Sequence, residues 1–255
     1  MPVLFVGHGN PMNAIERNDF SRSWNELGRR LPKPRAVLCI SAHWETRGVF
    51  VTATDKPETI HDFYGFPRAL FDVRYPAPGD PDLARRVAGI ISGVKVSLDP
   101  GRGLDHGAWS VLVAMYPAAD IPVVQLSLDT SKPGQFHYSL ARELAPLRDE
   151  EVLIVGSGNM VHNLRLFSFH DPQPLPWAVD CDAKLRERIL ARDHQALMDC
   201  DTLGASARLA VPTPEHYFPL LYPLALQEAA EPASFFNERV LSALSMTSVL
   251  IGAPA

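Results

Sequence analysis

The sequence has few cysteines, no long hydrophobic run and no excess of positive charge. Its three cysteines, Cys39, Cys181 and Cys200, form no CxxC pair, so we expect buried or incidental thiols in a reducing cytoplasm. No apolar run approaches the roughly 18 residues of a membrane-spanning helix. The net charge of -5 and the scattered Lys and Arg residues argue against a surface that binds nucleic-acid phosphates. We therefore expect neither a membrane nor a nucleic acid as partner.

The start of the chain also lacks the charged segment, apolar segment and cleavage site of a signal peptide. We therefore expect a cytoplasmic protein that is not exported. The 255 residues are 46% hydrophobic and 21% charged, which is ordinary for a globular protein. This length suits one large α/β domain or two small ones, and we favour a single domain over residues 1–255.

Short apolar runs alternate with stretches of helical periodicity along the chain. Strands are predicted over residues 3–7, 36–41, 48–53, 94–98, 122–128, 151–158 and 247–252. Helices with charged outer faces are predicted over residues 18–31, 81–91, 135–147 and 182–198,. Such alternation predicts an α/β fold, with a central, mostly parallel sheet flanked by helices.

One long segment, residues 55–80 (DKPETIHDFYGFPRALFDVRYPAPGD), shows no sustained periodicity. In a compact domain a loop of this length is usually functional. A flexible linker is a weaker interpretation, because it would leave several aromatic side chains in water: Phe63, Tyr64, Phe66, Phe71 and Tyr75. We expect this segment to form a wall of a substrate pocket.

Five of the nine histidines follow predicted strands or lie in loops. They are His8 in GHGNP, His43 in CISAHW, His106 in GRGLDHGAW, His162 in GSGNMVHN and His216 in TPEHYFP. In an open α/β sheet, ligands bind beyond the carboxyl ends of the strands, where side chains from separate strands converge. Imidazole is a common metal ligand, and wide spacing of ligands argues against a zinc finger. We expect a catalytic metal site in loops beyond the strand ends.

The other four histidines have simpler interpretations. His137 and His194 fall within predicted helices, and His170 lies in a polar loop. We expect core or surface positions for these three. His61 lies in the aromatic segment, where it could equally face a substrate or not.

Several segments, in this order and with these separations, resemble the class III extradiol ring-cleavage dioxygenases. They are GHGNPMNA, SAHW, TIHDFYGFP, YPAPG, GLDHGAW, VQLSLD, GSGNMVHNL and TPEHYFPLLY. Within this family, the sequence is most similar to the bacterial enzymes of the 4,5-DOPA extradiol dioxygenase type. The resemblance extends from His8 to the last predicted strand.

The resemblance implies that His8 and His43 bind the metal and that His216 is the third ligand. At the position of His162 the family has a histidine that transfers protons or completes the metal shell. His106 corresponds to a histidine that lines the pocket near oxygen and substrate. Relatives in the wider class use two histidines and a glutamate, so Glu215, next to His216, is an alternative third ligand.

The activity implied is the opening of a catechol (DOPA-like) ring with O2 to a muconic semialdehyde. It requires one divalent metal per chain, and Fe(II) is expected for oxygen chemistry. Zn(II) is the alternative metal. It binds histidines avidly but has no redox chemistry, and His162 could then serve as a fourth ligand.

Two other function classes stay open. A zinc hydrolase would need a carboxylate base such as Asp105 or Glu215 near a metal-bound water. A non-catalytic binding protein similar to the Memo-type proteins would share the fold. The identity of the catechol and the oligomeric state stay open as well. The candidate cations for a carboxylate-bearing substituent are Arg68, Arg74 and Arg102, each of which we expect at the surface.

Overall fold

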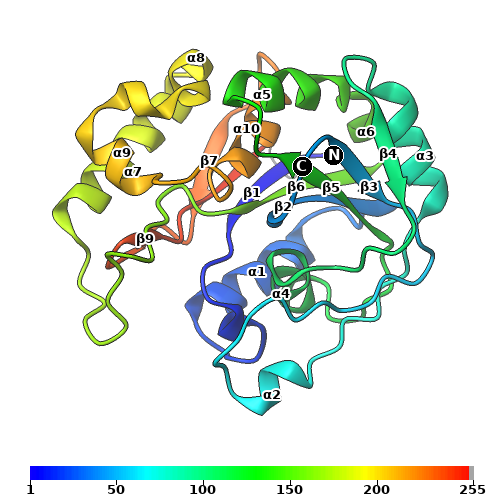
Figure 1. Ribbon diagram of the computed structural model, residues 1–255, viewed down its shortest axis with the longest axis horizontal. Coiled ribbons are helices and arrows are strands. Elements are labelled where there is room, and N and C mark those ends of the chain that lie inside the picture. The colour runs from blue at the N-terminus through cyan, green and yellow to red at the C-terminus, as the bar shows by residue number, and fades with distance from the viewer. Residues whose placement is uncertain (253–255) are drawn as a thin grey trace.

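The computed structural model describes residues 1–252, so the last three residues of the predicted domain lie outside the described residues. At its centre is one eight-stranded sheet (Figure 1). In spatial order its strands are β4 (Val96–Asp99), β3 (Val49–Thr52), β5 (Val123–Asp129), β2 (Ala36–Thr46), β6 (Val152–Gly158), β1 (Val3–Gly7), β10 (Ser248–Ile251) and β7 (Ala233–Phe236).

The four central strands, β5, β2, β6 and β1, are mutually parallel. At one side, β10 and β7 join antiparallel. At the other, β3 pairs antiparallel with β5 and parallel with β4. The mostly parallel sheet predicted from the sequence is confirmed, and it places the carboxyl ends of β1, β2 and β6 side by side.

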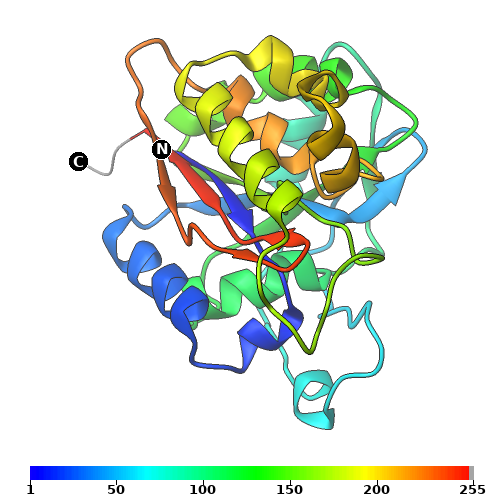
Figure 2. The ribbon, with the colours of Figure 1, turned by 90° about the vertical axis from the view of Figure 1, so that its left-hand side faces the viewer.

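Helices cover both faces of the sheet (Figures 1 and 2). One face carries α1 (Asp19–Arg30), α2 (Arg68–Phe71) and α4 (His106–Met115). The other face carries α3 (Pro81–Ile90), α5 (Gly134–Glu143), α6 (Pro146–Asp149), α7 (Pro176–Leu190), α8 (His194–Met198), α9 (Ala205–Ala210) and α10 (Phe218–Ala225). The 3-10 helices η1 (Pro11–Ala14) and η2 (Cys200–Leu203) and a hairpin of β8 (Val240–Leu241) and β9 (Leu244–Ser245) complete the chain.

Each central strand contributes to two hydrophobic cores. Along β1, Val3 and Phe5 pack in one core, whereas Leu4 and Val6 pack in the other. Successive side chains of a strand point to opposite faces of its sheet. Since both faces are covered by helices, all four side chains are buried and the strand reads as a continuous apolar run.

Several helices, among them α1, α3 and α4, begin where the sequence supplies a capping side chain. Asn18 and Ser21 form a reciprocal capping box at the start of α1, and Asp80 and Asp105 accept backbone N–H bonds at the starts of α3 and α4. These bonds satisfy amides that have no partner within the helix. The cap at Asp105 fixes the orientation in which His106 enters α4.

Two predicted helices are each divided in the structure. The helix predicted over residues 135–147 ends at Glu143 and restarts as α6 at Pro146, since proline cannot donate the hydrogen bond that would continue it. The helix predicted over residues 182–198 begins earlier, at Pro176, and is interrupted near Arg192, which has a φ of 58°. That left-handed conformation ends a helix.

The hydrophobic periodicity of the sequence did not predict several elements, among them α4, α10 and β7. Nearly all of α4 is buried, so it lacks the polar stripe that gives a helix its periodicity. α10 is buried as well and contains Pro219 and Pro223. Among residues 1–252, no helix is both long enough and apolar enough to cross a bilayer.

Candidate metal centre and its cavity

His8 follows β1 directly and is almost completely buried. The next residue, Gly9, has a φ of 59°, a conformation that suits glycine, and it turns the chain away from the sheet. His8 Nδ1 lies 3.0 Å from Ser157 Oγ, and that hydroxyl donates to the carbonyl of Gly107. The Ser157 oxygen therefore accepts from His8 Nδ1–H, which leaves the Nε2 lone pair free to bind a metal.

His43 lies within β2, not after it as the sequence predicted. Between Ile40 and Glu45 the pairing of β2 with β5 is irregular, because β2 advances by more residues than its partner. His43 occupies this bulge-like segment, where a strand can redirect a side chain. Gly107 packs so closely against the His43 ring that a Cβ atom there would lie 2.9 Å from its Cδ2.

His216 stands two residues before α10 and is buried. Its Nδ1 lies 3.1 Å from Glu215 Oε1. A carboxylate can only accept, so His216 donates Nδ1–H and its Nε2 is the free nitrogen. The backbone carbonyl of His216 accepts a 2.8 Å bond from the N–H of Asn159, directly after β6, which ties this turn to the sheet.

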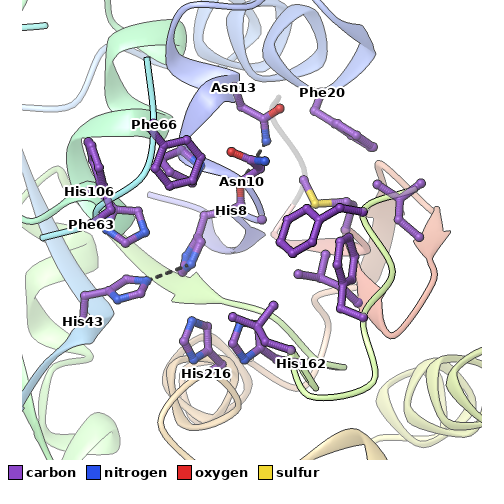
Figure 3. Close-up of a pocket in the computed structure, with 18 residues that line it drawn as sticks. His8, Asn10, Asn13, Phe20, His43, Phe63, Phe66, His106, His162 and His216 are labelled. Atoms are coloured by element: carbon purple, nitrogen blue, oxygen red, sulfur yellow. Dashed lines mark hydrogen bonds between the residues drawn. The ribbon is translucent and has the colours of Figure 1, made fainter. Parts of the chain in front are cut away.

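His8, His43 and His216 come together as one potential ligand set (Figure 3). One nitrogen of each ring lies within 4.8 Å of the others. The Nε2 atoms of His8 and His43 are 3.1 Å apart. Three converging imidazole nitrogens with a cavity beside them are the arrangement of an open catalytic metal site.

Burial keeps these rings neutral. It is the main cause that lowers the pKa of His8 and of His216 well below the usual value, and the neighbouring imidazoles lower it further. Burial, followed by His106, lowers the pKa of His43 to about 4. Since a metal binds the neutral form of histidine, the cluster is ready for ligation at neutral pH.

His162 lies beside this set rather than within it. Its ring stacks on that of His216, with centroids 3.5 Å apart and planes 7° from parallel. It belongs to a second group of potential ligands with Glu215 and His216. Burial lowers the pKa of His162 to about 4, partly opposed by Glu215. His162 is thus a neutral base that faces the cavity (Figure 3).

His106 is the first residue of α4, whereas the sequence placed it in a loop. Its ring centroid is 3.9 Å from that of His43, and its Nδ1 is 3.0 Å from Asp62 Oδ2. Burial alone would raise the pKa of Asp62, but its contacts with His106 outweigh burial and lower it to about 2. An ionised Asp62 therefore holds the His106 ring at the edge of the cavity.

The histidines line one end of a cavity of about 310 Å³. Residues from α1, the loop after β6 and the β8–β9 hairpin make the other end almost entirely apolar: Phe20, Leu164, Phe167, Phe169, Leu241, Leu244 and Met246. Phe20 lies opposite His43 in Figure 3. The volume suits a one-ring compound with a short substituent.

The aromatic segment at residues 55–80 contributes Phe63 and Phe66 to the cavity wall, as expected of it. The argument that its aromatic residues avoid water is wrong for Tyr64, which is 91% exposed. His61 does not line the cavity. Its Nε2 lies 3.1 Å from the carbonyl oxygen of Val73, within the loop itself.

The three candidate arginines do not line the cavity. Arg68 and Arg74 are exposed and bond within their own loop. Arg102, which the sequence predicted at the surface, is instead half-buried, because it donates to the carbonyl of His43 and to the buried Asp105. The Asp105 carboxylate also accepts from Ser41 and Gln125, so it is occupied by structural bonds.

The remaining histidines and the cysteines have the simple positions predicted. His137 is buried and contacts the Tyr222 hydroxyl and the Asp129 carbonyl. His194 contacts Tyr138 and Gln227, and His170 is exposed. All three cysteines are free.

Sequence reasoning missed Ser157 and Asp62, which contact the histidine rings. A polar residue near the end of a buried strand, as in GSGNM, is a signal that could have indicated Ser157. Nothing in the sequence indicated Leu241, Leu244 and Met246, because the hairpin that carries them was not predicted.

Comparison with known proteins finds a matching family and several relatives. Residues 2–248 match the family model of the catalytic LigB subunit of aromatic ring-opening dioxygenase. A protein of Escherichia coli (strain K12) named 4,5-DOPA dioxygenase extradiol is 48% identical, over 99% of this chain and 95% of that protein. A protein of Beta vulgaris with the same name is 42% identical, over 86% and 84%.

A solved structure also matches the fold. The crystal structure of an uncharacterized protein from Escherichia coli K12 superposes with a TM-score of 0.87 at 43% identity, over 99% of this chain and all of that one. The family resemblance inferred from the motifs is confirmed by the family model and by these relatives.

Proposed function

The chain belongs to the family of the catalytic LigB subunit of aromatic ring-opening dioxygenases, and we propose that it opens a catechol ring with O2 beside the diol, giving a muconic semialdehyde. It is an extradiol dioxygenase, the activity named in relatives from bacteria and plants. The observation that carries the proposal is the set of three converging imidazole nitrogens at one end of a largely apolar cavity.

The two alternative classes are not favoured. A zinc hydrolase needs a carboxylate base near the metal-bound water, but neither Asp105 nor Glu215 lines the cavity. A non-catalytic Memo-like role would need no cavity for a small molecule. Here five histidines gather at the end of one.

The donor set fits a divalent metal. His8, His43 and His216 would hold it, since hydrogen bonds at Nδ1 free the Nε2 atoms of His8 and His216 and burial keeps all three rings neutral. Glu215 contacts His216 through its carboxylate, which suits an orienting partner better than a competing third ligand.

When bound, a redox-active metal supplies coordination of the catechol oxygens and of O2, with electron transfer between them. His162 would accept a proton from a catechol hydroxyl and return it after ring cleavage. Its pKa of about 4 keeps it unprotonated before substrate binds. His106, held by Asp62, would line the reacting face, and the apolar walls would exclude water.

The finer parts of the proposal are one metal per chain, Fe(II) for oxygen chemistry with Zn(II) as a redox-inactive substitute, and a DOPA-like catechol. The names of the relatives support the last point. Roles for the site residues, a single domain over residues 1–255, and a cytoplasmic location without nucleic-acid or membrane partners belong to the same proposal.

Anaerobic reconstitution with Fe(II), followed by addition of L-DOPA and air, tests the function. The proposal predicts oxygen uptake with formation of a yellow ring-opened product, and neither in the zinc-loaded protein. Oxygen uptake without a ring-opened product would contradict extradiol cleavage. Equal turnover with zinc would contradict the redox role of the metal.

A further inference from the structure

The end of the cavity away from the histidines carries no formal charge. Among the described residues that line the cavity, none is Lys, Arg, Asp or Glu. A carboxylate or an ammonium group bound there would lose hydration without gaining an opposite charge, which is costly. The amino-acid group of a DOPA-like substrate therefore has no ionic partner inside this cavity.

The polar side chains at this end are largely occupied. Asn13 donates to the carbonyl of His8 and accepts from Asn18. Asn10 accepts from the N–H of Met12 through its side-chain oxygen, which leaves its NH2 group as a neutral donor. Neutral amides form no ion pair with either charged group of an amino acid.

Arg239 is a cation beside the cavity wall, and its contacts lie outside the cavity. Arg239 stacks on the Phe20 ring, with its guanidinium carbon 5.6 Å from the ring centroid, and lies 3.5 Å from Asp19. Phe20 lines the cavity and Arg239 does not. The guanidinium is thus outside the wall and already paired with a carboxylate.

Resting on the proposed function, we propose that the cavity recognises the catechol ring and the first carbons of its substituent by apolar contact, and forms no ion pair with charges farther along. The substrate class is then catechols with a short substituent at ring position 4, whatever its charge or configuration. The exposed Leu164 and Phe169, 57% and 77% accessible, would leave the distal group in water.

Steady-state kinetics of the iron-loaded enzyme with L-DOPA, D-DOPA, 4-methylcatechol and 4-propylcatechol test this. We expect kcat/KM for the two DOPA enantiomers to agree within threefold. 4-Propylcatechol should exceed 4-methylcatechol by up to about fourfold for each added methylene that is buried. A larger enantiomer ratio, or no gain with chain length, would overturn the inference while leaving extradiol cleavage intact. Absence of ring opening with every catechol would instead overturn the proposed function.

A matched pair of variants tests the missing charge directly. Leu164→Arg places a cation at the cavity rim, whereas Leu166→Arg places one on the same loop at a residue that is 46% exposed and does not line the cavity. With 3-(3,4-dihydroxyphenyl)propionate, we expect Leu164→Arg to raise kcat/KM relative to 4-propylcatechol by up to about fivefold, the upper end of the range for an exposed ion pair. Leu166→Arg should leave that ratio unchanged.

A third variant, Arg239→Ala, tests whether Arg239 binds a substrate carboxylate. If Arg239 binds a substrate carboxylate, this variant lowers kcat/KM for L-DOPA and for the propionate but not for 4-propylcatechol, and the inference is wrong. Equal kcat/KM ratios in Arg239→Ala and the unmodified enzyme support it.

Discussion

The two ends of the cavity are built in different ways. At the inner end, each imidazole arrives from a different element, and two of the rings are fixed by hydrogen bonds that they donate to Ser157 and Glu215. At the outer end, apolar side chains such as Leu164 and Phe169 are partly exposed and make no directional bonds. The inner end holds its rings in fixed positions, as catalysis requires. The outer end can contact substituents of different kinds.

The strongest test of this difference is to remove an inner ligand. His8→Ala should abolish stoichiometric metal binding while leaving the fold intact, because His8 lies beyond the strand end. Metal analysis with circular dichroism measures both, and His170→Ala, in an exposed loop, is the matched control. Full metal occupancy in His8→Ala would exclude this residue as a ligand.

The second test separates proton transfer from ligation. His162→Gln should retain iron but lower single-turnover ring cleavage by about 10² to 10⁴, the usual effect of a positioned proton-transfer residue. Iron content and turnover are measured on the same sample. Loss of iron in step with activity would make His162 a ligand, and near-normal turnover with full iron would assign it neither role.

The third test addresses the hydrogen bonds that orient the rings. Ser157→Ala and Glu215→Gln should each weaken metal binding about 10- to 100-fold, and both less than His216→Ala. Ser127→Ala removes another buried serine, in β5 and bonded to Thr46, and should leave the metal Kd unchanged. A Glu215→Gln effect larger than that of His216→Ala would restore Glu215 as the third ligand.

The fourth test concerns a histidine outside the cavity. Burial lowers the pKa of His137 to about 4, against about 6.5 in the unfolded chain. Between these values the unfolded state binds more protons, so acidification from pH 6.5 to 4 destabilises the metal-free protein through His137 by about 2–3 kcal/mol. His137→Gln should lose this part of the pH dependence in urea unfolding. Identical pH dependence in the two proteins would contradict the shift.

The inner end could be predicted from sequence because the positions of its histidines depend on which strands they follow. His8 and His162 follow β1 and β6, which are adjacent and parallel, with Val6 opposite Ser157. Apolar runs reveal such strands, and strand ends converge. Positions set by irregular backbone were less accessible: His43 lies in a distorted part of β2, and His106 opens a helix that has no polar stripe.

The outer end could not be predicted for a different reason. Leu244 lies in the β8–β9 hairpin and Met246 follows it. Each strand of this hairpin has only two residues, which is too short to give a periodic signal. Met246 lies against Gly9, near the other end of the chain, and this contact depends on tertiary packing. Apolar residues of this kind look like core residues in the sequence, and only the fold shows that they border a cavity.

The most direct test of the proposed metal site is an anaerobic titration of the metal-free protein with Fe(II). The initial rate of catechol ring opening is measured after each addition. One site formed by His8, His43 and His216 predicts a rate that rises linearly and becomes constant at one iron per chain. Ring opening without added metal, or a break at two irons per chain, would contradict it.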